Sequence, residues 1–560
     1  MAYYITEKEC NGCTSCARIC PTGAASGEKE ETHRINAAVC IECGACGKVC
    51  PQGAVKDPGG QVPPRLPRKL WEKPFFSKQK CNGCSICVDV CPTDCITLGE
   101  PNTKDPNAYP ELAEADAKKC VGCGFCARGC PVDAIEMCTE QAAAEKIEQE
   151  KMKQEKNMGW RLKKGFIRVF QMIMRFFGVI LPFSVPLLLT GAGSVRKLAE
   201  NVKARGIKNV LVVTDKVLMD LKLLDGLLTS LSEKKITYTV FDDVQPNPTI
   251  ENVEAGRKIY KQNQCKAIIA FGGGSPIDCA KVIGARIRNP YLPVRFMKGL
   301  FRVIIPIPPL FCIPTTAGTG SETTVAAVIT NAATHEKFAI NDLKLIPEIA
   351  VLDPELMVGL PPHITSTTGM DALTHAVEAY IGLSGSAYTD ECAEYATKLI
   401  FENLEKVYQD GSDLDSRNNM ALASFYAGAA FTRAYIGYTH AIAHNLGGLY
   451  GVPHGLANAV ILPYVLDFCK EAAKKKLARL AVAGGLGING DSDVVLADRF
   501  VEKVKTLNKN LNIPTFIKEL KKSDVPLIAE RALKEAHPLY PVPKLMTRIE
   551  CEELVRKLVA

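Results

Sequence analysis

The chain has little histidine, no long block of like charges and no uncharged apolar run of transmembrane length. Only eight of its 560 residues are histidine, and the formal net charge is +7. A small net charge with both signs interspersed argues against a nucleic-acid partner. No segment offers the roughly 20 uncharged apolar residues of a membrane-spanning helix. The N-terminus MAYYITEKEC also lacks the apolar stretch of a secretory signal, so a reduced, cytoplasmic location is expected.

Cysteine is abundant by contrast, and most of the 24 cysteines fall in four copies of one pattern. Each copy reads C-x2-C-x2-C-x3-C-P, the bacterial ferredoxin arrangement for [4Fe-4S] clusters. A disulfide framework belongs in an oxidising compartment, and a zinc site uses C-x2-C pairs without this four-cysteine-plus-proline run. The sequence therefore predicts four [4Fe-4S] clusters with the ligands Cys10, Cys13, Cys16, Cys20, Cys40, Cys43, Cys46, Cys50, Cys81, Cys84, Cys87, Cys91, Cys120, Cys123, Cys126 and Cys130.

The four runs are expected to work in pairs, because the fourth cysteine of one run reaches the cluster of its partner run. Residues 1–58 and 77–140 are thus predicted to be two α+β ferredoxin-like bicluster modules, separated by a stiff Pro-rich linker, 59–76. In the first module, Cys50 would join Cys10, Cys13 and Cys16, and Cys20 would join Cys40, Cys43 and Cys46. The remaining cysteines show no mutual spacing and are expected to be buried free thiols in the protein of an anaerobe.

Residues 141–185 are predicted to be a helical linker followed by an amphipathic helix. Segment 141–157 is rich in good helix formers, with Lys and Glu four residues apart. From 161 to 181 apolar residues dominate, but Arg, Lys or Gln recurs every three or four residues along one face. Three alternatives stay open for this helix: packing on its own protein, peripheral contact with a membrane surface, or docking of a partner.

The pattern changes after residue 186 to short β-branched runs that alternate with helical stretches. The runs at 210–214, 237–241, 267–270 and 311–314 predict an α/β nucleotide-binding domain with a parallel sheet over 186–360. Helical periodicity dominates 361–560, which predicts an all-helical domain. The fold class is therefore multidomain: two ferredoxin-like modules, an α/β domain and a helical domain.

A glycine-rich turn follows the third run. Residues 271–278 read FGGGSPID and precede a predicted helix, whose unhindered N-terminal amides can approach a pyrophosphate. A glycine triplet alone is equally typical of an ordinary strand-to-helix turn.

Three further motifs follow this turn in order. The set is GGGSPIDCAK (272–281), PTTAGTGSE (314–322), GMDALTHAVEAY (369–380) and GYTHAIAHNLGGLYGVPHG (437–455). Together these motifs resemble the iron-containing (group III) alcohol dehydrogenase family, from about residue 186 to the C-terminus. The resemblance implies a nucleotide-binding half, a helical metal-binding half and an active site in the cleft between them.

Half of the few histidines fall in the last two motifs. Asp371 and His375 stand four residues apart on a predicted helix and share one face, and His440 and His454 can complete a four-ligand site. Three imidazoles and one carboxylate suit divalent iron or zinc better than magnesium. The resemblance assigns the same four residues as metal ligands. It also places His444 at the family's non-ligand active-site histidine, either as a proton relay or as an orienting neighbour.

The resemblance further assigns contacts to a nicotinamide cofactor. They fall on the glycine turn and the PTT motif, at Gly272, Gly273, Gly274, Ser275, Asp278, Thr315 and Thr316. Asp215 resembles the family residue that faces the adenosine ribose. A carboxylate there favours NAD over NADP, because it accepts a hydrogen bond from the 2′-hydroxyl and repels a 2′-phosphate. An ordinary helix cap is the alternative role for Asp215.

These parts predict hydride transfer between NAD(P) and a short-chain alcohol, diol or hydroxyacid, or the corresponding aldehyde, at a metal that polarises the substrate oxygen. Family members commonly form dimers or larger assemblies, so a homo-oligomer is expected.

The iron-sulfur half adds something that hydride chemistry does not require. Clusters pass single electrons, whereas a nicotinamide exchanges a hydride, and the usual converter is a flavin. No convincing flavin-binding motif is evident in the chain. Three hypotheses follow: a dehydrogenase wired to an external flavoprotein, ferredoxin or hydrogenase; an electron-transfer subunit with a mainly structural dehydrogenase half; or a dehydrogenase with redox-sensing clusters. Complete metal and cysteine sets favour the first.

Overall fold

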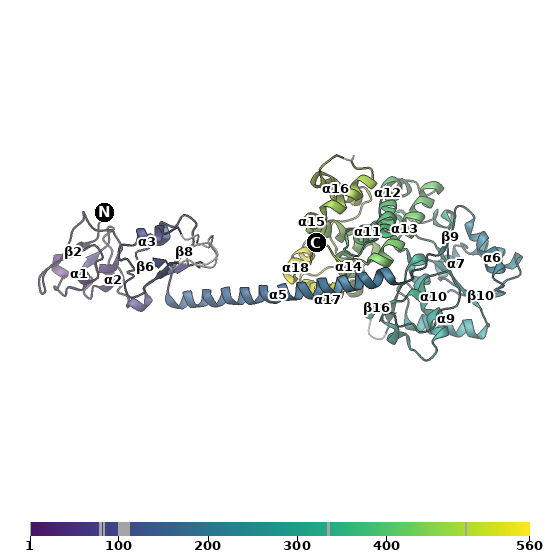
Figure 1. Cartoon of the computed structure of the whole chain (residues 1–560), viewed down its shortest axis with the longest axis horizontal. Coiled ribbons are helices and arrows are strands. Elements are labelled where there is room, and N and C mark those ends of the chain that lie inside the picture. The colour runs from purple at the N-terminus through teal and green to yellow at the C-terminus, as the bar shows by residue number, and fades with distance from the viewer. Residues whose placement is uncertain (1, 78–80, 82–83, 99–112, 333–335, 488–489) are drawn as a thin grey trace. The chain divides into compact units, whose positions relative to one another are not determined.

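The computed structural model describes residues 2–77, 81, 84–98, 113–332, 336–487 and 490–560. The chain divides into two compact units, Met1–Leu162 and Lys163–Ala560. Figure 1 labels many of the elements of both units.

The first unit contains two small modules of the same design. In each module the first strand pairs antiparallel with the last, and a second two-stranded ribbon lies between them in sequence. A short helix begins inside each cysteine run. The first module comprises β1 (Tyr4–Ile5), α1 (Ser15–Ile19), β2 (Ala25–Ser26), β3 (Arg34–Ile35), α2 (Ala45–Val49) and β4 (Val55–Lys56). The second comprises β5 (Lys73–Phe76), α3 (Ile86–Asp89), β6 (Ile96–Leu98), β7 (Ala113–Ala115), α4 (Phe125–Arg128) and β8 (Ile135–Cys138).

The Pro-rich segment packs against both modules. Leu66 N donates to Lys48 O of α2 at 3.1 Å. A Cβ on Gly122, in the fourth cysteine run, would lie 2.7 Å from Glu72 O. The end of the predicted linker, residues 73–76, forms β5 and belongs to the second module, because it pairs antiparallel with β8.

A single 41-residue helix, α5 (Glu140–Ile180), replaces the predicted sequence of a linker helix and a second helix. Only residues 158–160 separate the two segments, and the one glycine among them, Gly159, costs a helix about 1 kcal/mol. Beyond Lys163 the helix packs on its own protein. Arg168 donates to Val542 O at 2.7 Å, and Gln171 Nε2 donates to Tyr540 O at 2.6 Å. Packing on its own protein, one of the three alternatives for this segment, is therefore observed.

The α/β domain is built on a six-stranded parallel sheet. Its spatial order is β11-β10-β12-β14-β17-β9. The strands are β9 (Leu187–Thr190), β10 (Asn209–Val213), β11 (Thr237–Phe241), β12 (Ala267–Gly272), β14 (Leu310–Pro314) and β17 (Ile349–Leu352). The sequence runs predicted four of these strands. A side sheet adds β13 (Gly299–Leu300), β15 (Ala326–Asn331) and β16 (Glu336–Asn341).

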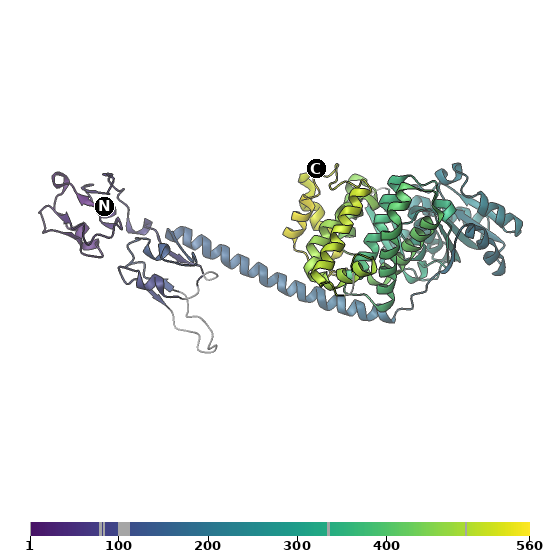
Figure 2. The same ribbon diagram turned by 90° about the horizontal axis from the view of Figure 1, so that it is seen from above.

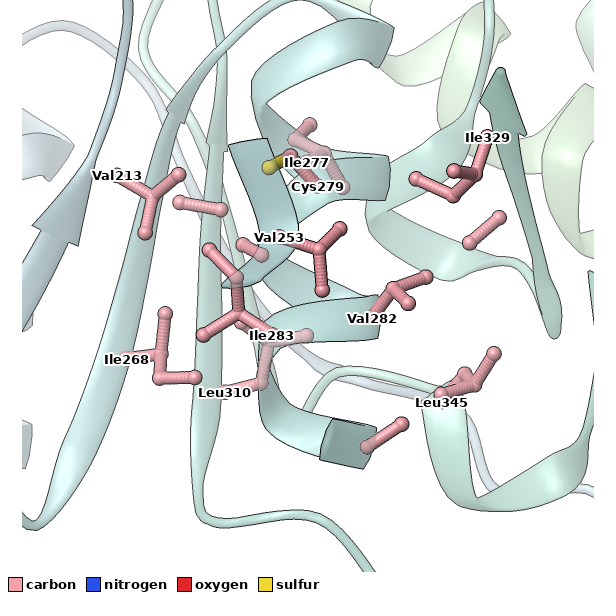
Figure 3. Packing of buried hydrophobic residues seen from close by; sticks show 14 of the residues in the cluster. Val213, Val253, Ile268, Ile277, Cys279, Val282, Ile283, Leu310, Ile329 and Leu345 are labelled. Atoms are coloured by element: carbon pink, nitrogen blue, oxygen red, sulfur yellow. The ribbon is translucent and has the colours of Figure 1, made fainter. Parts of the chain in front are cut away.

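Helices cover both faces of the parallel sheet, since successive residues of a strand point to opposite faces. Val213 and Ile268 pack with Val253 and Ile283 of α9 and α10 in one buried cluster, which Figure 3 shows. Val212 and other residues that point to the opposite face pack in a second buried cluster with α6 and α8. The covering helices are α6 (Ser194–Ala204), α7 (Lys216–Asp220), α8 (Asp225–Glu233), α9 (Ile250–Gln262) and α10 (Gly274–Arg288).

The remainder of the second unit is helical, as the periodicity predicted. Its helices lie side by side in Figure 2, in green to yellow. They are α11 (Pro362–Ile381), α12 (Ala387–Gln409), α13 (Leu414–Ala434), α14 (Tyr438–Tyr450), α15 (His454–Ala483), α16 (Asp493–Asn510), α17 (Val525–Ala536) and α18 (Arg548–Arg556). Within the described residues, none of the helices has the length and apolarity that crossing a membrane requires.

Candidate active site and cluster sites

Three helices bring together the four predicted metal ligands. Asp371 and His375 share one face of α11, His440 lies in the first turn of α14, and His454 begins α15. One ligand atom from each residue lies within 4.8 Å of the others. Asp371, His375 and His440 are buried, whereas the His454 side chain is 40% exposed. The group therefore has the donor set and spacing of a site for a single metal ion, with one side accessible.

Two neighbouring side chains hold these residues in place. Glu378 stands one turn after His375 on α11, and its Oε2 lies 2.7 Å from His440 Nδ1. The same carboxylate accepts hydrogen bonds from the backbone N–H groups of Gly437 and Thr439. Asn458 Nδ2 donates to Asp371 Oδ1 at 2.6 Å. Glu378 thus fixes the ring of His440 and leaves its Nε2 for the site, as second partners of metal-bound imidazoles do.

The charges of the site suit a cation. Burial lowers the pKa of His375 and His440, so both imidazoles are neutral at pH 7. Burial opposes ionisation of Asp371, but the neighbouring histidines and the Asn458 bond hold its pKa below the usual value. The buried His440 Nε2 has no hydrogen-bond partner among the described residues. Neutral imidazoles beside a carboxylate are the protonation states that bind divalent metals, so these residues fit one.

His444 lies beside this group, one turn after His440. Its ring stacks on His454 with centroids 5.3 Å apart, and its Nδ1 lies 2.7 Å from Glu535 Oε1 on α17. Burial would lower the pKa of His444, but the Glu535 carboxylate raises it above the ordinary value. Tyr540 also donates to Glu535 Oε1, at 2.8 Å. His444 is therefore oriented by its own partner while it contacts the ligand group.

The glycine turn lies at the carboxyl end of β12, where parallel sheets bind nucleotides. Gly272 has φ +146°, and a Cβ there would lie 2.6 Å from Pro276. Thr315 N, at the end of β14, donates to Gly272 O at 3.1 Å. The structure thus places the predicted residues of the two motifs together, with Gly273, Gly274 and Ser275 at the start of α10 and Thr316 beside Gly273.

The loop after β14 links the glycine turn to the metal ligands. A Cβ on Gly318 would lie 2.6 Å from Thr368 Cβ on α11, so only glycine permits this approach. The Gly318 backbone also interacts with His375. The loop that adjoins the glycine turn therefore touches a metal-ligand helix directly.

Two predicted cofactor residues have structural partners. Asp215 caps α7, accepting from Leu218 N at 3.0 Å, and is only half-buried. Asp278 accepts from Ser321 Oγ and Val328 N, both at 2.9 Å, one at each carboxylate oxygen. Asp278 therefore ties α10 to the neighbouring loop and strand, whereas Asp215 combines a cap with an accessible carboxylate.

In the first unit, the fourth cysteine of one run lies with the first three cysteines of its partner run. One small cavity is lined by Cys10, Cys13, Cys16 and Cys50, and another by Cys20, Cys40, Cys43 and Cys46. A third small cavity is lined by Cys91, Cys120, Cys123 and Cys126. Cys95, which has no place in the cysteine pattern, also lines the third cavity, with its Sγ 3.4 Å from Cys91 Sγ. The four cysteines of the pattern around each cavity provide the ligand set of a [4Fe-4S] cluster.

Comparison with known proteins agrees with both halves of the chain. Residues 186–354 match the model of the iron-containing alcohol dehydrogenases, and residues 365–559 match that of the C-terminal part of the same family. Residues 4–54 and 80–134 each match a 4Fe-4S dicluster domain.

Individual relatives cover the dehydrogenase part almost completely. 1,3-Propanediol dehydrogenase from Klebsiella pneumoniae is 41% identical, over 62% of this chain and 90% of the relative. NAD-dependent methanol dehydrogenase from Bacillus methanolicus is 37% identical, over 63% and 93%. A crystal structure of a 1,3-propanediol oxidoreductase superposes with a TM-score of 0.65 at 38% identity, over 67% of this chain and 99% of that one.

The fold and the site together define a metal-dependent nicotinamide oxidoreductase. The chain belongs to the iron-containing alcohol dehydrogenase family and carries, in addition, N-terminal ferredoxin-type dicluster domains. Membership implies a divalent metal and NAD, and the dicluster domains imply [4Fe-4S] clusters.

Motif reading missed the residues that position the ligands. Glu378 lies in the GMDALTHAVEAY motif, three residues after His375, and Asn458 stands four residues after His454. Helical spacing places each on the face of a ligand, so both were within reach of the pattern. Glu535 and Tyr540 lie about 90 residues beyond His444 in sequence, and only the packing of α17 on α14 reveals them.

Proposed function

We propose that the chain is a metal-dependent, NAD-linked alcohol dehydrogenase or aldehyde reductase acting on short-chain alcohols or diols. The convergence of one carboxylate and three imidazoles within 4.8 Å, beside the loop that adjoins the glycine turn, carries the proposal. The relatives' names, 1,3-propanediol dehydrogenase and methanol dehydrogenase, favour small primary alcohols as substrates. A hydroxyacid is the less supported substrate class.

In this reaction the alcohol carbon gives a hydride to the nicotinamide, its oxygen loses a proton, and an aldehyde leaves. Asp371, His375, His440 and His454 would hold divalent iron or zinc, which polarises the substrate oxygen when bound. His444 presents Nε2 to take up the proton, because Glu535 occupies its Nδ1. Ser275 and the first amides of α10 would bind the cofactor pyrophosphate.

A matched pair of α11 variants tests this assignment. His375→Ala should lose bound metal and alcohol-dependent NADH formation together. His363→Ala changes an exposed histidine on the same helix and should retain both. Metal content by elemental analysis and turnover with 1,3-propanediol and ethanol provide the readouts. Wild-type activity in metal-depleted His375→Ala would contradict the proposal.

The clusters, four in number in this proposal, would connect the dehydrogenase to one-electron carriers. Complete cysteine sets in all four runs support an electron-transfer role. A flavoprotein is the favoured partner, because a flavin converts hydride to single electrons; a ferredoxin or hydrogenase would act beyond it. Redox sensing by the clusters is the alternative, and it predicts that cluster oxidation state alters turnover without any partner.

Several finer points belong to the same proposal. Asp215 favours NAD over NADP. The eight Cys residues outside the four runs are all buried and form no disulfide, which supports a reduced, cytoplasmic setting. A homo-oligomer is proposed from the family alone. The domain limits 1–58, 59–76, 77–140, 141–185, 186–360 and 361–560 stay predictions, and β5 would move the start of the second module to residue 73.

The outer face of α5 supports peripheral contact with an anionic membrane surface. Phe166, Val169, Met172 and Ile173 are each about half or more exposed, and no acidic residue occurs between Glu155 and Glu200. Apolar side chains with flanking Lys and Arg are typical of interfacial helices. Co-sedimentation with phosphatidylserine vesicles should be lost in Phe166→Ser and absent with phosphatidylcholine alone. Equal sedimentation of wild type and variant would contradict the contact.

A further inference from the structure

The two ferredoxin modules share one buried core. Ala45, Trp71 and Val121 form this core, and Trp71, the largest of the three, is only 1% exposed. Ala45 begins α2 in the first module, Val121 lies in the fourth cysteine run, and Trp71 comes from the segment between the modules. We call these three residues the junction.

A cysteine from each module packs against the junction. Cys43, from the second run, and Cys123, from the fourth, both contact this core. The two cysteines therefore pack against the same small core, although 80 residues separate them in the chain. By contrast, Cys81 and Cys84 do not belong to this core.

The segment between the modules fixes this arrangement. Trp71 Nε1 donates to Leu66 O at 2.9 Å, and Leu66 N donates to Lys48 O on α2 at 3.1 Å. Directly after this segment, Lys73 begins β5 of the second module and donates through Nζ to Cys120 O at 2.6 Å. Hydrogen bonds thus tie the segment to both modules, and the approach of Cys43 and Cys123 does not depend on a loose linker.

We propose that the junction is an electron crossing between the two modules, so that the four cysteine sets form one continuous path. The proposal rests on cluster binding by the four runs but not on the dehydrogenase activity. An electron would pass between the set of Cys43 and the set of Cys123, one being oxidised and the other reduced by a single electron. No bond is made or broken, and no proton is released.

Three cationic side chains lie around Trp71 and should raise the reduction potentials of the cluster sites next to it. Lys48 Nζ lies 5.4 Å from the ring centroid, and Arg68 and Lys73 each lie 5.8 Å from it. Nearby positive charge favours the reduced form of an iron-sulfur site, because reduction adds a negative charge. The two sets that flank the junction should therefore have higher reduction potentials than they would without these cations.

Paired cysteine variants of the full-length protein test the crossing. Cys123→Ala removes a ligand from the set at the junction, whereas Cys84→Ala removes one from the other set of the same module. Iron and sulfide content first establishes which sets are loaded. Electron paramagnetic resonance of the reduced protein then reports the spin relaxation of the first-module sets. Cys123→Ala should slow this relaxation, and Cys84→Ala should leave it unchanged. Unchanged relaxation in Cys123→Ala, with the first-module iron retained, would overturn the crossing.

A second measurement keeps every cluster ligand in place. Lys73→Met should lower the reduction potential of the junction sets in a redox titration followed by the same resonance signals. Lys29→Met is the control, because Lys29 is exposed, pairs with Glu30 at 3.8 Å and is not among the cations at Trp71. An unchanged potential in Lys73→Met would overturn the role of the cations. Low iron content in the wild type would instead contradict the cluster assignment on which the proposal rests.

Discussion

Glu378 Oε2 lies 2.7 Å from His440 Nδ1, and both side chains are 2% exposed. The same carboxylate accepts two backbone N–H groups at the start of α14. Glu378 therefore couples the position of α14 to the orientation of a metal ligand.

Replacing this carboxylate should weaken metal binding without removing a ligand. In Glu378→Gln, the His440 ring loses its charged partner, and loss of such a partner typically costs 10–100-fold in metal affinity or activity. Competition with a chelator measures the affinity directly. Metal affinity equal to that of the wild type would show that Glu378 does not position His440.

Glu535 should affect turnover rather than metal binding. It contacts His444, which is not one of the four ligands, so Glu535→Gln should retain metal while losing about tenfold in kcat, the lower end of the range for such partners. The KM for alcohol should change little. Tyr540→Phe removes the second hydrogen bond to the same oxygen and serves as a milder comparison. Loss of metal in Glu535→Gln would contradict the separation of roles.

Asp215 allows cofactor choice to be separated from helix capping. Asp215→Asn keeps a side-chain acceptor for Leu218 N but removes the charge that would repel a 2′-phosphate. Catalytic efficiency with NADP should rise relative to NAD, and thermal stability should stay unchanged. Asp215→Gly removes both functions. A wild-type preference for NADP would contradict the assignment.

A cluster of charged side chains on α9 and α10 should make the free energy of unfolding depend on pH. Arg286 and Arg257 both donate to Glu254, and together they outweigh burial and lower the pKa of this carboxyl. Because the pKa is lower in the folded state, the stabilisation is present above the unfolded-state value, about 4.3, and is lost as pH falls through the folded-state pKa. Glu254→Gln should cost about 1 kcal/mol at pH 7 and less at pH 3, by denaturant unfolding. An equal cost at both pH values would contradict this.

Much of the fold and of the candidate site could be predicted from local sequence signals. These signals are the cysteine spacing, strand runs such as 267–270 and the spacing of Asp371 and His375. Each involves residues that are close in sequence and are also close in the structure. Contacts between distant segments were not accessible in this way. The edge strand β9, with half-exposed residues, lacks a buried-strand signal. In the sequence, Trp71 is part of a Pro-rich linker. Its position in the core that the two modules share is evident only from the structure.

The most direct test of the whole account follows both halves of the protein in one experiment. Anaerobically purified, cluster-oxidised protein is mixed with 1,3-propanediol and limiting NAD, while NADH absorbance and cluster bleaching are recorded together. The account predicts that NADH accumulates while the clusters stay oxidised, because no hydride-to-electron converter is proposed within the chain. Bleaching of the clusters without an added flavoprotein would contradict it.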